Sequence, residues 1–100
     1  MKFNLDNLVA ELESLDQKLQ DPEIFKDQKK IREVSSRKKQ ISQAVELYVQ
    51  YKNAYKAYDE AQEMLQTEKD PEMKELAKMQ KDESTEIIEK LEDELKFALL

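Results

Sequence analysis

The sequence predicts an all-α fold: an antiparallel three-helix bundle with a short first helix and two long helices forming a hairpin. Charged residues make up 40% and apolar residues 39% of the 100 positions, a balance typical of helices with solvated outer faces. The chain has no glycine and only two prolines, so it offers few turns. Apolar residues recur every three or four positions, which predicts helices over residues 5–20, 28–66 and 71–98.

The first predicted helix has a single seam of leucines. Asn4 precedes it and should cap it, because its side chain can accept a hydrogen bond from an early backbone N–H. The leucines then recur at spacings of three and four, at Leu5, Leu8, Leu12, Leu15 and Leu19. A helix this short is marginal alone in water, so we expect it to dock on the second helix.

Two similar turn sequences separate the helices. In Asp21-Pro22-Glu23, proline disfavours helical geometry at the residue before it and is well tolerated at the first helical position. Asp21 is therefore free to cap, and Asp27 can cap again, so we expect a break near residues 26–28. Asp70-Pro71-Glu72 repeats this capping sequence between the two long helices. Because the connection is short, we expect these helices to be antiparallel neighbours.

The second helix carries two overlapping seams, which together form a face wide enough for two neighbouring helices. One seam consists of Ile41, Ala44, Tyr48, Tyr51, Tyr55, Tyr58, Gln62 and Leu65, and the other of Ile31, Val34, Lys38, Ile41, Val45, Tyr48, Lys52 and Tyr55. We expect the tyrosines to be half-buried at the seam margin, since each hydroxyl needs a partner or water. A platform for stacked bases is the less favoured interpretation.

The third helix presents one apolar stripe on an acidic background. The stripe consists of Met73, Leu76, Ala77, Gln80, Ser84, Ile87, Ile88, Leu91, Leu95 and Ala98. Gln80 and Ser84 should be its weak points, and Ile87 to Leu95 its strongest part. We interpret the glutamates outside the stripe as a solvated face.

Charge is distributed unevenly along the chain. Residues 21–58 carry nine bases and five acids, whereas residues 59–100 carry six bases and fourteen acids, and the net charge is −6. The bases concentrate between Lys26 and Lys39. That segment is either an ordinary solvated helix face or a docking surface for phosphate or an acidic protein.

The sequence lacks the usual machinery of catalysis. It contains no histidine, no cysteine and no glycine-rich phosphate loop, and its carboxylates fall on exposed helical faces. We therefore expect no enzyme activity, catalytic residue, cofactor or metal. No apolar run approaches a membrane span, and the N-terminus lacks a signal peptide, so we expect a cytoplasmic interaction domain.

The order of these features resembles a known family. The segments that carry the resemblance are Leu19 to Ile24, Glu46 to Lys52, Glu63 to Leu65, Asp70 to Ala77 and the glutamate-rich last helix. They resemble the N-terminal helical domain of bacterial class-1 peptide chain release factors, over essentially the whole chain. Asp70 to Ala77, at its distance from Leu47-Tyr48-Val49-Gln50-Tyr51-Lys52, is the most specific part.

The resemblance implies a role in translation termination. Within the family the chain is more similar to type 1, which reads UAA and UAG, than to type 2. The family's Gly-Gly-Gln loop and codon-reading tripeptide lie in other domains, so we expect the catalytic and codon-reading domains to be absent from residues 1–100. What remains would dock on ribosomal RNA and protein near the stalk base and contact the class-2 release factor GTPase, with neither membrane nor DNA as partner.

The candidate ribosome contacts are six bases between positions 26 and 39. They are Lys26, Lys29, Lys30, Arg37, Lys38 and Lys39. The alternatives are a type 2 domain or, from another class, a free-standing coiled-coil adaptor or chaperone-like hairpin that oligomerises through its tyrosine seam.

Overall fold

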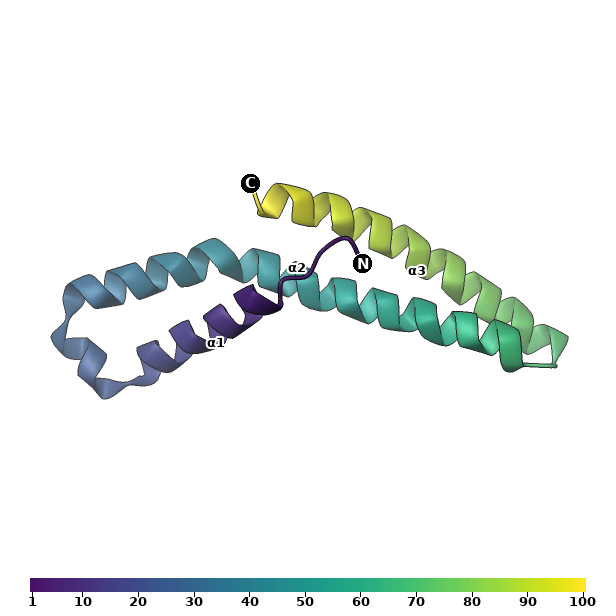
Figure 1. Ribbon diagram of the computed structural model, residues 1–100, viewed down its shortest axis with the longest axis horizontal. Helices are drawn as coiled ribbons and strands as arrows, with labels where there is room; N and C mark the ends of the chain where they lie inside the picture. The colour runs from purple at the N-terminus through teal and green to yellow at the C-terminus, as the bar shows by residue number, and fades with distance from the viewer.

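The computed structural model describes residues 1–100 as four helical elements joined by short connections. They are α1 (Asp6–Gln20), the 3-10 helix η1 (Pro22–Lys26), α2 (Gln28–Thr67) and α3 (Pro71–Ala98). The molecule is elongated, with extents of 64 × 26 × 16 Å (Figure 1). The predicted all-α fold with a hairpin of two long helices is confirmed, and no helix has an apolar stretch long enough to cross a membrane.

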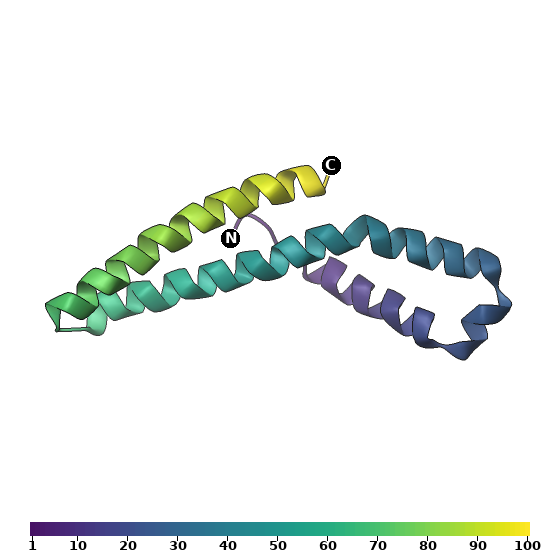
Figure 2. The ribbon, with the colours of Figure 1, turned by 180° about the vertical axis from the view of Figure 1, so that it is seen from behind.

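The two partners of α2 lie end to end along it and not side by side around it. In both views α1 runs beside the first half of α2 and α3 beside the second half (Figures 1 and 2). No Cα atom of α1 comes within 8 Å of a Cα atom of α3. The wide face predicted for two neighbours therefore serves them one after the other.

Two separate cores follow from this arrangement. The first joins α1, η1 and the start of α2 through Leu15, Ile24, Val34 and Ile41. The second joins α2 and α3 through Leu47, Tyr48, Tyr51, Ala54, Ile88, Leu91 and Leu95. Leu47, Ala54 and Ala61 are buried but belong to neither predicted seam. Their seven-residue spacing marks the line on which α3 packs, and the two alanines allow the helices to approach closely.

Aspartate caps fix the corners of the chain. The carboxylates of Asp21, Asp27 and Asp70 each accept a hydrogen bond of 3.0 Å from a backbone N–H two or three residues later. The break expected near residues 26–28 is present, because η1 ends at Lys26 and α2 begins at Gln28. Asn4 also accepts from an early backbone N–H, that of Asp6, although Leu5 directly precedes the helix.

The apolar stripe predicted for α3 is wider than the face that the fold buries. Leu76 is 57% exposed and Ile87 43% exposed, so the prediction was wrong for these side chains. Ser84, expected to be a weak point, is buried instead. The physical reason is that α3 has a single neighbour, and one helix covers only a narrow line of another.

Candidate functional site

The basic segment lies at the end of the molecule where η1 turns into α2. Lys26 ends η1, and the other candidate bases lie on the first four turns of α2. The structure divides them into an inner pair that contacts α1 and an outer group exposed to solvent.

Arg37 and Lys38 form the inner pair. The Arg37 guanidinium donates to both carboxylate oxygens of Glu11, with an Nη2–Oε1 distance of 2.8 Å. Lys38 Nζ lies 2.7 Å from Asp16 Oδ1. The hydrogen bond from Arg37 lowers the pKa of Glu11, and the same bond raises the pKa of Arg37. Both cations therefore hold α1 against α2.

The outer group consists of exposed cations. Lys26 pairs with Glu23 of its own short helix, with an Nζ–Oε2 distance of 3.1 Å, whereas the others have weak or no internal partners. Lys30, Arg32 and Lys39 take part in no ion pair, and Lys29 Nζ is 4.0 Å from Glu33. Lys29, Arg32 and Lys39 recur three and seven residues apart, which places them along one side of α2. Arg32 was not among the predicted contacts. Arg32 lies seven residues before Lys39 and away from the side of α2 on which Val34 is buried. This spacing is the sequence signal that identifies Arg32 as part of the exposed basic face.

Tyr48 and Tyr51 are fully buried, against the prediction that the tyrosines are half-buried at the seam margin. Their exposed fractions are 1% and 0%, whereas Tyr55 and Tyr58 are half-buried as predicted. The Tyr48 hydroxyl donates to Asp6 Oδ1 at 2.8 Å. These two tyrosines can be buried because remote carboxylates and the N-terminal backbone satisfy their hydroxyls.

The Tyr51 hydroxyl joins the N-terminal segment to the hairpin. It donates to Glu92 Oε2 and accepts from the Lys2 backbone N–H, both at 2.9 Å. The N-terminus accordingly lies in the angle between α2 and α3 (Figure 2). Burial and the bond to Glu92 raise the pKa of Tyr51 to about 12. The bond to Asp6 likewise raises the pKa of Tyr48.

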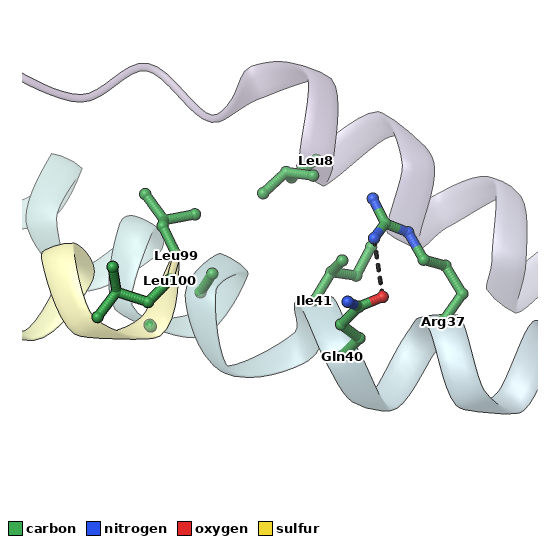
Figure 3. Close-up of a pocket in the computed structure, with 8 residues that line it drawn as sticks. Leu8, Arg37, Gln40, Ile41, Leu99 and Leu100 are labelled. Carbon is green, nitrogen blue, oxygen red and sulfur yellow. Dashed lines mark hydrogen bonds between the residues drawn. The ribbon is translucent and has the colours of Figure 1, made fainter.

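A cavity of about 210 Å³ lies where α1, α2 and the end of α3 meet. Figure 3 shows Leu8 of α1 and Leu99 after α3 bordering it from different elements, with the Arg37–Gln40 hydrogen bond on one side. Most of the residues that line it are apolar. It can hold an apolar group, but it brings together no nucleophile, base or pair of carboxylates.

The arrangement as a whole presents charged surfaces that are suited to binding. No group of three or more histidine, cysteine, aspartate or glutamate side chains could hold a metal ion. The chemically distinct surfaces are the outer cations at one end of the molecule and an acidic hairpin at the other.

Comparison with known proteins gives consistent matches. Residues 8–100 match the family described as PCRF domain. The chain is 40% identical over 96 residues to peptide chain release factor 1 of Geobacillus sp. (strain WCH70), covering 96% of this chain and 27% of that protein. It is 35% identical over 100 residues to peptide chain release factor 1 of Bacillus licheniformis, covering all of this chain and 28% of that protein. The chain thus spans less than a third of the length of these relatives, and no solved structure matches it.

Proposed function

This chain belongs to the peptide chain release factor family, and on that premise we propose that it serves translation termination as a ribosome-docking domain. The observation that carries the proposal is the outer cation group. Lys29, Arg32 and Lys39 lie exposed along one side of α2, although the chain as a whole has a net charge of −6. Cations without strong internal partners are available to phosphates, so ribosomal RNA is the partner that this face fits.

The inner pair has a different role in this proposal. Arg37 and Lys38 hold α1 against α2. They thereby fix the orientation of the junction between η1 and α2, where Lys26 and Lys30 lie. A substitution at either position would weaken docking indirectly, by loosening α1. A test of direct contact must therefore leave both residues unchanged.

Charge reversal of the outer face tests the proposal. The variant Lys29→Glu/Arg32→Glu/Lys39→Glu should bind isolated large ribosomal subunits more weakly than the unchanged chain. The matched control is Lys74→Glu/Lys78→Glu/Lys90→Glu, which makes the same charge change at three exposed lysines of α3 that form no ion pair. Equal weakening by both variants would mean that net charge, and not this face, governs binding.

The finer parts of the proposal rest on the name of the relatives, peptide chain release factor 1, and on the family resemblance. We propose that this domain acts within a cytoplasmic type 1 release factor that reads UAA and UAG. In this account the domain itself acts by docking near the stalk base and by contacting the class-2 GTPase, without catalysing a reaction. A release factor that contains this domain should release peptide from ribosomes stopped at UAA and UAG but not at UGA. Release at UGA would assign the factor to type 2.

A further inference from the structure

A groove of about 320 Å³ lies between α2 and α3, in the hairpin half of the molecule. Tyr55 and Tyr58 line it from α2, and Glu89 and Glu92 line it from α3, with Thr85 and Ile88 completing the lining. Two aromatic rings thus stand opposite two carboxylates. The proposed ribosome contact uses none of these residues.

The carboxylate of Glu92 is largely shielded from water and has only one weak ion-pair partner. Its side chain is only 14% exposed, and the nearest cation, Lys2 Nζ, is 4.0 Å away on a side chain that is 78% exposed. Its hydrogen bond from Tyr51 satisfies one oxygen but brings no positive charge. A carboxylate removed from water gains strongly from a cation placed beside it, so this one favours a positively charged ligand.

Glu89 adds a second, free negative charge at the mouth of the groove. It is exposed and forms neither an ion pair nor a side-chain hydrogen bond. The surrounding stretch of α3, residues 82–94, holds seven acids and one base. Such a surface repels phosphate-bearing molecules and attracts cations, so a cationic side chain on a partner protein is complementary to it.

The tyrosine wall suits a cation as well. Aromatic faces attract cations that lie within about 6 Å of the ring centre. The molecule already makes such a contact beside the groove, where Lys81 Nζ lies 5.7 Å from the Tyr58 ring centroid. Lys81 forms no ion pair with Glu89 or Glu92, so it leaves both groove carboxylates available.

We propose that this groove binds the guanidinium of an arginine side chain presented by a partner protein. Arginine fits better than lysine, because its planar group can stack on a tyrosine ring while its N–H groups pair with a carboxylate in a two-pronged fashion. In the bound state the arginine stacks on Tyr58 or Tyr55 and pairs with Glu89. Its charge also offsets the largely shielded carboxylate of Glu92.

Titration with a minimal ligand tests the chemistry directly. N-acetyl-arginine amide is added to the isotope-labelled chain, and its neutral isostere N-acetyl-citrulline amide serves as the matched control ligand. Arginine should shift the backbone resonances of Tyr55, Tyr58 and Glu89, with an affinity at least ~5-fold higher than that of citrulline, because an ion pair is lost in the control. Equal affinities, or shifts centred outside the groove, would overturn the proposal.

Substitutions test separately whether the glutamate wall and the tyrosine wall of the groove contribute to arginine binding. Glu89→Gln should weaken arginine binding about threefold or more, whereas Glu83→Gln, at an exposed glutamate outside the groove lining, should not. Tyr58→Leu should weaken it by a similar factor, and Tyr58→Phe should retain it because the ring remains. Melting curves establish that each variant folds. Unchanged binding by folded Glu89→Gln or folded Tyr58→Leu would contradict the assigned role of that wall.

Discussion

The Tyr51 hydroxyl links three separate parts of the chain, so Tyr51→Phe should destabilise the fold measurably. The hydroxyl donates to Glu92 Oε2 and accepts from the Lys2 backbone N–H, both at 2.9 Å. The substituted ring keeps its edge-on contacts with Phe3 and Tyr55, whose ring centroids lie 6.0 and 5.1 Å away. The change therefore isolates the hydrogen bonds from the packing of the ring.

The expected loss follows from the surroundings of the two partners. A hydrogen bond to a charged acceptor contributes about 1.5–3 kcal/mol to stability. The Lys2 N–H can bond to water in the variant, because Lys2 is exposed. The Glu92 side chain is 14% exposed and regains only part of its hydration. We therefore expect Tyr51→Phe to lower the free energy of unfolding by about 2 kcal/mol.

Urea unfolding followed by circular dichroism at neutral pH measures this loss. Tyr58→Phe is the matched control, because Tyr58 is half-buried and its hydroxyl forms no hydrogen bond; it should change stability by less than about 0.5 kcal/mol. Combining Tyr51→Phe with Glu92→Gln should reveal a coupling energy of about 1 kcal/mol. If Tyr51→Phe were as stable as Tyr58→Phe, the hydroxyl network would not contribute to the fold.

Three further perturbations test other parts of the structure. The free energy of unfolding should fall as pH rises from about 10 to about 12, because the unfolded state loses the Tyr51 proton first, and Tyr51→Phe should flatten this fall in alkaline urea titrations. The free energy of unfolding should also fall as pH drops below 4.5, because Arg37 lowers the pKa of Glu11 in the folded state. Glu11→Gln should reduce the size of this acid-induced loss of stability in acid titrations. Ala61→Leu should lower the free energy of unfolding by about 1–3 kcal/mol in thermal melts, because Ala61 is 0% exposed between the long helices, whereas exposed Ala10→Leu should have little effect.

Local signals predicted the course of the chain well. Asp21, Asp27 and Asp70 act on N–H groups two or three residues away, so their capping roles could be read directly from the sequence. A heptad pattern, by contrast, states which side of α2 is covered but not how far each partner extends along it. The end-to-end arrangement of α1 and α3 and the resulting exposure of Leu76 therefore became apparent only in the structure.

How far each tyrosine is buried depends on residues that are distant in the sequence. Tyr48 and Tyr51 bond to carboxylates 42 and 41 positions away, and nothing in their own spacing identifies those acceptors. The basic segment was visible in the sequence, but its division into inner and outer cations was not. That division depends on which acids α1 brings next to Arg37 and Lys38.

The salt dependence of binding to large ribosomal subunits shows whether the outer cations of α2 contact ribosomal RNA. Each phosphate contact contributes about one unit to the slope of log affinity against log salt concentration. The variant Lys29→Glu/Arg32→Glu/Lys39→Glu should therefore bind with a slope about 2–3 units shallower than that of the unchanged chain. An unchanged slope would show that the outer cations of α2 do not contact ribosomal RNA.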